Sequence, residues 1–178
     1  TKKIKSYLYK NHIKSAVIIG AGYVGLEIAE NLKNLNVDVT IVEQNHQVLS
    51  TVDYDIASFV HNTIKKNNVS LKLNKRVEEL LFENDQVVTK LTNETLISDI
   101  VIVAVGVSPD TMLAKKLGLQ LGIRDSIIVD EHMNTSVKDV YAVGDAVEVK
   151  NLITKENSLI PLAGPATKQG RIAADNIC

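Results

Sequence analysis

A glycine-rich segment directly after a short apolar run limits the possible folds of this chain more than any other pattern in it. Val17-Ile18-Ile19 leads straight into Gly20-Ala21-Gly22-Tyr23-Val24-Gly25, and a helical pattern of apolar residues follows. This order of strand, glycine loop and helix is typical of dinucleotide-binding folds. There the first glycine makes a tight turn, the second lets the backbone approach a pyrophosphate, and the third lets the helix pack on the strand. We predict these roles for Gly20, Gly22 and Gly25, with the phosphates at the helix N-terminus.

The second half of the same fingerprint follows at the expected distance. Apolar spacing predicts a helix over residues 26–35, closed by Asn36, and a strand over 37–42 that ends in Glu43. A carboxylate there accepts hydrogen bonds from ribose hydroxyls and repels a 2′-phosphate. Residues 44–47 contain no Arg or Lys, so we predict a preference for NADH over NADPH. Two alternatives remain: Glu43 only ends a strand, or His46 or a residue from elsewhere meets the phosphate.

The elements that follow predict an α/β domain with an insertion. A helix over residues 54–66 has Asp53 as its N-cap and is expected to place Ile56, Phe59, Val60 and Ile64 on one side. A strand is expected over 69–73, three short antiparallel strands over 76–82, 86–91 and 95–97, and a strand buried on both faces over 99–105. The fold class predicted is a Rossmann-like NAD(P)-binding domain with a parallel sheet and an antiparallel β-meander insertion.

Two further glycines each follow an expected strand. Gly106 either brings a loop close to the cofactor or belongs to a turn before a short helix at 111–117. In the tail, strands are expected over 127–129 and 140–143, and the second runs into Gly144-Asp145. That Asp either reaches a sugar or polyol hydroxyl or belongs to an ordinary turn. The segment Pro161-Leu162-Ala163-Gly164 is followed by an expected helix that ends near Asn176, with Pro165 suited to its first position.

Composition argues against several classes of function. The net charge of −1 gives no reason to expect nucleic acid or an anionic membrane surface as partner. No apolar run reaches the roughly 18 residues of a membrane span, and no secretory signal is seen, so we expect a cytoplasmic protein. The single cysteine, Cys178, and four scattered histidines, taken as surface residues, predict neither a disulfide nor a metal site. The early lysines are expected on a solvated helix (Lys2, Lys3, Lys5, Lys10 and Lys14).

The motifs together resemble the middle of a flavin-dependent pyridine nucleotide–disulfide oxidoreductase. The branch most similar contains NADH oxidases, NADH peroxidases and coenzyme A–disulfide reductases. The segments that carry the resemblance are Val17 to Glu27, Ala104 to Pro109, Asp139 to Ala146 and Pro161 to Arg171. In this family an NADH domain is inserted into a FAD domain. The resemblance therefore implies an NADH-binding domain over residues 1–125 and a partial FAD-binding segment over 126–178.

The resemblance also implies roles for single residues. Tyr23 is similar to a gating residue that covers the flavin, and Glu27 to a Glu near the nicotinamide and flavin. Glu27 is also explained as a first-turn carboxylate that matches the helix dipole. Asp145 is similar to an Asp at the FAD ribityl and phosphate region. No catalytic residue is expected in the chain. The cofactor-binding set implied is Gly20, Ala21, Gly22, Tyr23, Val24, Gly25, Glu27, Glu43, Gly106, Asp145, Leu162 and Ala163.

Three parts of the family pattern have no counterpart in this sequence. They are the first glycine-rich FAD motif, the redox-active cysteine and the dimerisation domain. We therefore expect a fragment that does not catalyse turnover alone and that comes from a longer, homodimeric protein using NADH and FAD. Oxygen, peroxide, coenzyme A disulfide and persulfide all remain open as final acceptor. The alternative is a stand-alone NADH-binding or sensing module, which residues 1–125 by themselves do not exclude.

Overall fold

The computed structural model describes residues 2–178, which form two compact units. The first unit ends at Gly106 and the second begins at Val107. This division rests on contacts within the chain. The boundary predicted between residues 125 and 126 concerns ligand binding, and it stays a prediction.

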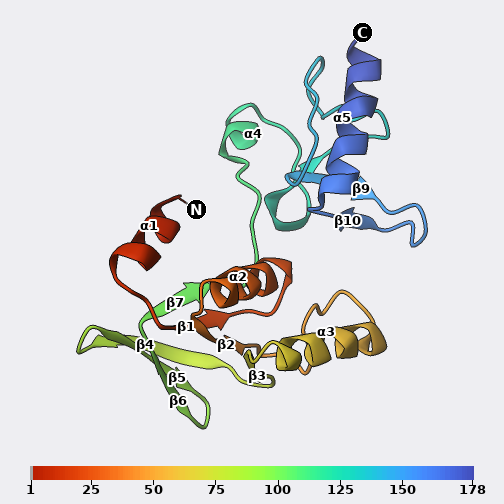
Figure 1. Cartoon of the computed structure of the whole chain (residues 1–178). Helices are drawn as coiled ribbons and strands as arrows, with labels where there is room; N and C mark the ends of the chain where they lie inside the picture. Colours follow the sequence, from red (N-terminus) through yellow and green to blue (C-terminus); the bar gives the residue numbers. More distant parts are fainter. Residues whose placement is uncertain (1) are drawn as a thin grey trace. The chain divides into compact units, whose positions relative to one another are not determined.

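A parallel sheet of four strands forms the centre of the first unit (Figure 1). The strands are β1 (Ser15–Ile19), β2 (Asp38–Val42), β3 (Ser70–Lys72) and β7 (Ile100–Val103), in the order β3-β2-β1-β7. Helix α2 (Tyr23–Asn34) connects β1 to β2, and α3 (Tyr54–Lys66) connects β2 to β3. This alternation of parallel strands and helices confirms the predicted Rossmann-like α/β class.

The helices of the first unit end where the sequence contains asparagine. Asn36 has a φ of 60° and Asn68 a φ of 54°, a left-handed conformation that asparagine tolerates better than most residues. Helix α3 begins after Asp53 as predicted, whereas α2 begins three residues before the predicted Leu26. The lysine-rich segment forms helix α1 (Lys2–Lys10), which has no fully buried residue.

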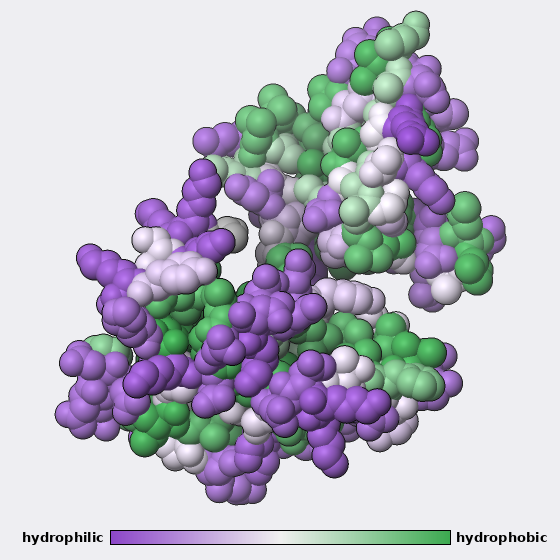
Figure 2. Space-filling view, in the orientation of Figure 1, coloured by the Kyte–Doolittle hydropathy of each residue, from purple (hydrophilic) through white to green (hydrophobic). Residues whose placement is uncertain are grey.

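The main core lies between the sheet and its helices. Ile18 and Ile41 are completely buried there, with Ala57 of α3 packed against the same cluster. The predicted buried side of α3 was partly wrong: Ile56 and Phe59 are 53% and 70% exposed. Ala57, Val60 and Ile64 face the core instead, because they share the helix stripe that is turned toward the sheet. Figure 2 shows hydrophilic side chains over much of the visible outer face of α2 and α3.

The insertion between β3 and β7 is an antiparallel meander, as predicted. It consists of β4 (Val77–Glu83), β5 (Gln86–Leu91) and β6 (Thr95–Ser98). Positive φ values at Asn84 and Asp85 make the tight turn from β4 to β5. Leu91 packs with Val17 and Val42 in a second small core.

Strand β7 is shorter and more exposed than predicted. The strand was expected over residues 99–105 and buried on both faces, but Val103 is 59% exposed and Val105, beyond its end, is 71% exposed. The reason is its position, because β7 is an edge strand of the four-stranded sheet in this unit. An apolar run alone does not distinguish an edge strand from a central one.

The second unit contains a small three-stranded sheet and one long helix. Its elements are α4 (Met112–Lys116), a 3-10 turn η1 (Ile123–Asp125), β8 (Ile127–Ile128), β9 (Val147–Lys150), β10 (Asn157–Leu159) and α5 (Ala163–Ile177). The strand order is β10-β9-β8, with β8 parallel and β10 antiparallel to β9. Neither β9 nor β10 is among the strands predicted from the sequence.

The strand predicted over residues 140–143 is wrong. Only Tyr141 forms an isolated bridge, with Asn134. Met133, next to Asn134, and Asp139, before the predicted strand, both adopt positive φ. The chain therefore bends close to each of the two bridged residues, and no extended partner is left along which a ladder could continue. In residues 2–178, no helix is long and apolar enough to cross a membrane.

Candidate functional site

The carboxyl ends of β1 and β7 meet at the point where the strand order reverses. Such a switch point is where open α/β sheets bind ligands. Gly20 follows β1, and Ala104 follows β7. The Ala104 N–H donates to the Ile19 carbonyl at 2.7 Å, and the Gly20 N–H donates to the Val42 carbonyl at 2.8 Å. The glycine loop is therefore fixed between its two neighbouring strands.

Two of the three fingerprint glycines are required by the fold itself. Gly20 has a φ of 103°, and a β-carbon there would overlap the Ala104 carbonyl oxygen. A β-carbon on Gly25 would overlap the Gly20 carbonyl oxygen, which is the close approach of helix to strand predicted for this position. Any side chain at these positions would push α2 or β7 away from the loop.

Gly22 differs from the other two glycines. It is the N-cap of α2 with φ −77° and ψ −177°, an extended conformation that any residue adopts. A β-carbon on Gly22 would meet no atom within 4 Å. The folded chain therefore gives no steric reason for glycine at this position, and the space in front of it is open.

The Glu43 carboxylate lies against the glycine loop. Its Oε2 accepts a hydrogen bond from the Ala21 N–H at 2.8 Å, and its Oε1 accepts one from the Asn45 N–H at 2.9 Å. Each carboxylate oxygen has a second lone pair, so both remain able to accept from a ligand hydroxyl. Glu43 thus stabilises the loop, a role that was not predicted from the sequence, and each of its oxygens keeps one lone pair unused.

The segment after Glu43 supports the same loop from the other side. The Leu49 N–H donates to the Ala21 carbonyl at 3.0 Å, and the buried Val48 donates its N–H to His61 Nε2 at 3.2 Å. His61 was predicted to be a surface residue, but it is half-buried, and its ring nitrogen holds this segment in place. These supports were not predicted, although the apolar pair Val48-Leu49 in a polar stretch is a signal for them in the sequence.

The other predicted residues of the first unit surround this edge of the sheet. Tyr23 and Val24, in the first turn of α2, are both 54% exposed, and Glu27 is exposed one turn further along the helix. Gly106 has a φ of 126°, and a β-carbon on it would meet no atom within 4 Å. The backbone of the loop after β7 is therefore open to a ligand, whereas the direct contacts of Tyr23 and Glu27 remain predictions.

A second group of predicted residues lies in the second unit. The Gly144 N–H donates to the buried Gln169 side chain of α5 at 2.7 Å. Gly144, with a φ of 89°, precedes Asp145, while Leu162 is the N-cap of α5 and Ala163 its first residue. Gln169 follows Ala163 by six residues, about 9 Å along a helix axis. One side chain thus joins the Gly-Asp motif to the first half of α5.

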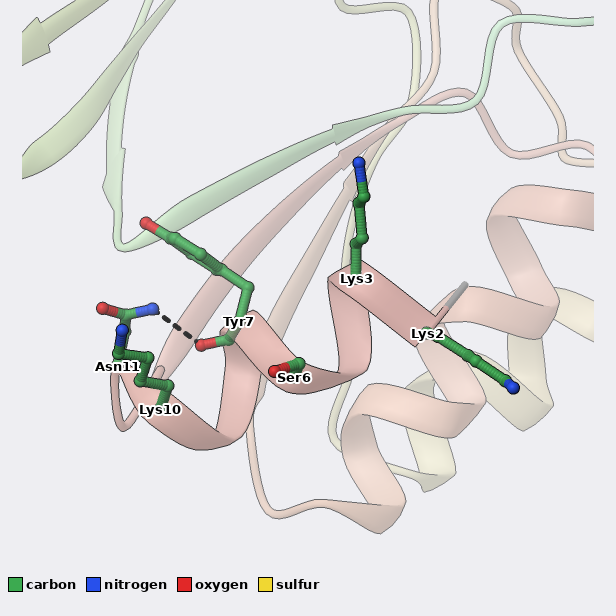
Figure 3. Close-up of a pocket in the computed structure, with 6 residues that line it drawn as sticks. All are labelled: Lys2, Lys3, Ser6, Tyr7, Lys10 and Asn11. Carbon is green, nitrogen blue, oxygen red and sulfur yellow. Dashed lines mark hydrogen bonds between the residues drawn. The ribbon is translucent and has the colours of Figure 1, made fainter.

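A shallow hollow of about 410 Å³ lies elsewhere, on α1 (Figure 3). Lys2, Lys3, Ser6, Tyr7, Lys10 and Asn11 line it, and none of these is a predicted site residue. Across residues 2–178, no group of three or more His, Cys, Asp or Glu side chains is arranged to hold a metal ion.

The sequence and the structure match known proteins over nearly the whole chain. A family described as pyridine nucleotide-disulphide oxidoreductase matches residues 1–170. An NADH oxidase of Methanocaldococcus jannaschii is 37% identical over 177 residues, which are 99% of this chain and 39% of that protein.

Two solved structures agree with this match. The crystal structure of reduced Bacillus anthracis CoADR-RHD superposes with a TM-score of 0.92 at 40% identity, covering 99% of this chain and 31% of that one. A NAD-dependent persulfide reductase from A. fulgidus gives a TM-score of 0.91 at 37% identity, covering 98% and 33%. The chain thus spans less than two fifths of the length of these relatives. It belongs to the pyridine nucleotide-disulphide oxidoreductase family.

Proposed function

We propose that the first unit binds NADH at the carboxyl edge of its parallel sheet. The observation that carries the proposal is Gly22, which is glycine although neither its backbone conformation nor its neighbours require it. A pyrophosphate approaching the start of α2 would use the open space in front of Gly22, and the helix N-terminus favours an anion there. The Glu43 carboxylate, held 2.8 Å from the Ala21 N–H, would accept from the adenosine ribose.

We further propose that the second unit contributes to a FAD site in a longer protein. Asp145 would reach the flavin's sugar-like chain, and the backbone at Leu162 and Ala163 would lie beside its ring. The open space at Gly144 and its hydrogen bond to Gln169 support this assignment, because they hold a bare backbone next to the Asp. When bound, FAD would supply the hydride acceptor, while this chain's residues bind and orient.

In this proposal the longer protein is a cytoplasmic, homodimeric NADH oxidoreductase. The nicotinamide-side residues implied by the resemblance are Tyr23, Val24, Glu27 and Gly106. The support is the family membership and the names of the relatives, one an NADH oxidase and one a NAD-dependent persulfide reductase. The proposal leaves the final acceptor open and assigns no catalytic acid or base to this chain. We expect the 178 residues alone to bind NADH without turning it over.

The test measures NADH binding by calorimetric titration. It compares the unmodified 178-residue chain, called the parent chain from here on, with its Gly22→Ala variant. Because a β-carbon at Gly22 meets no atom, the variant is expected to fold, with a melting temperature only slightly lowered by alanine at the N-cap. Its NADH Kd should rise about tenfold or more, because the new methyl group occupies the space of the pyrophosphate. A parent chain that does not bind NADH, or a variant that binds it equally well, would contradict the proposal.

A further inference from the structure

We propose that His61 of α3 is a positioning residue for the proposed NADH site, because it fixes the segment after β2, residues 44–49, against the glycine loop. The inference rests on the proposed function and goes beyond it, since His61 belongs neither to the glycine loop nor to the residues that would contact the nucleotide. It acts through the main chain of Val48, so no contact between its ring and the nucleotide is needed.

Residues 44–49 connect the two parts of the proposed site. At the start of the segment, the Asn45 N–H donates to Glu43 Oε1 at 2.9 Å. At its end, the Leu49 N–H donates to the Ala21 carbonyl at 3.0 Å. The Ala21 N–H in turn donates to Glu43 Oε2 at 2.8 Å. The carboxylate proposed to bind the ribose and the loop proposed to bind the pyrophosphate are therefore both joined to this one short segment.

The path of the segment depends on an anchor outside it. Leu49 has a φ of 48°, a left-handed conformation that leucine rarely adopts. Val48 is completely buried, so its N–H needs an acceptor within the protein. That acceptor is His61 Nε2, at 3.2 Å. Because Ala57 and Ile64 of the same helix are buried in the main core, His61 ties the segment to a fixed element.

The contact requires a neutral imidazole. Nε2 accepts only while the ring proton is on Nδ1, because both nitrogens of an imidazolium donate. The Tyr54 ring lies edge-on to His61 at 6.1 Å between centroids, and His46 stacks on Tyr54 at 6.1 Å. Lys65 follows His61 by one turn of α3. Protonation of His61 would therefore remove the acceptor of the buried Val48 N–H and release the segment.

The experiment measures the NADH Kd by calorimetric titration for the parent chain, His61→Leu and His61→Gln. Leucine has no acceptor, so the ordered segment is populated less, and the Kd should rise about three- to tenfold. Glutamine offers its amide oxygen in place of Nε2, so its Kd should stay within about twofold of the parent value. This rescue separates the hydrogen bond from the mere filling of space by the side chain.

A pH comparison tests the same contact without His61→Leu. Between about pH 8 and about pH 5.5, histidine side chains generally gain their second proton, whereas glutamine does not titrate. The parent chain should therefore lose more NADH affinity over this range than His61→Gln does. Both proteins contain His46 and Tyr54, so the difference between them reports His61 alone.

The matched control is Asp99→Asn. Asp99 accepts from the N–H groups of Lys14 and Ser15 at 2.8 and 2.9 Å, at the opposite end of β1 from Gly20. The variant weakens the first unit without touching residues 44–49, so its NADH Kd, measured below its melting transition, should equal the parent value.

Three results would overturn the inference while leaving the NADH site intact. They are an unchanged Kd in His61→Leu, an equal loss of affinity in His61→Leu and in either His61→Gln or Asp99→Asn, and an identical pH dependence in the parent chain and His61→Gln. If the parent chain bound no NADH at all, the proposed function itself would fail.

Discussion

Replacing Glu43 by alanine removes the carboxylate that joins the glycine loop to the end of β2. Two backbone N–H groups lose a charged acceptor, and such hydrogen bonds contribute about 1.5–3 kcal/mol each. The Asn45 N–H lies in an exposed residue, so water replaces much of its bond. Ala21 is only 1% exposed, and its N–H has no comparable substitute. We therefore expect a loss of about 2–3 kcal/mol in the free energy of unfolding, or roughly 10 °C in melting temperature for a unit of this size.

Thermal unfolding followed by far-ultraviolet circular dichroism, without nucleotide, measures this loss. Glu43→Gln should lose less, because its amide oxygen still accepts from one of the two N–H groups. Asp38→Asn, at the other end of the same strand and with a 92% exposed side chain, should melt with the parent chain. With nucleotide, Glu43→Ala should also bind NADH more weakly and discriminate less against NADPH. If Glu43→Ala melted with the parent chain, the structural role derived from the Ala21 contact would be refuted.

Two further predictions concern the contribution of a carboxylate to stability, at Asp99 and at Glu148. The Asp99 pKa is lowered from 3.8, chiefly by the Lys14 N–H, so its stabilisation is present above about pH 4 and is lost as the pH falls through the lower folded value. The stability deficit of Asp99→Asn in urea should therefore be clear at pH 7 and shrink at pH 3; equal deficits at both would reject the linkage. Glu148 is 4% exposed and accepts from the Ile123 N–H and from Ser126 Oγ, so Glu148→Ala should destabilise the second unit by about 3 kcal/mol. Faster proteolysis within residues 118–150 would report this loss, and an unchanged rate would argue against it.

The parallel half of the fold was predictable because each of its boundaries has a local cause. Asn36 and Asn67 follow the last residues of α2 and α3 closely, and the glycine loop marks the end of β1. Strand β5 has the predicted bounds, since a tight turn with two positive φ values precedes it. In these places the residues that determine the conformation lie within a few positions of it, so a single sequence contains the information.

The second unit was less predictable because its strands depend on distant partners. Strand β9 contains Glu148 among apolar residues, and its carboxylate is buried only because the turn at Ile123 supplies donors. The apolar run at 140–143 shows the reverse case, a strand-like pattern that forms no strand. The segment beside it bends at Met133, so pairing stops after one bridge. Pattern recognition cannot anticipate either outcome, because the partner segments are chosen by tertiary packing.

The residues of the site differ in what they indicate: some are required by the fold, and others indicate that a ligand binds. Gly20 and Gly25 would be required even in a chain that bound nothing, because the Ala104 backbone just after β7 and the Gly20 carbonyl occupy the space of a side chain. Their presence therefore supports the Rossmann-like fold and adds nothing about a ligand. Gly22 faces open space, and Glu43 retains unused lone pairs after its two backbone contacts. The inference to a dinucleotide thus depends on these two residues. Of the two, only Gly22 allows a substitution that separates ligand binding from folding, because Glu43 also stabilises the loop.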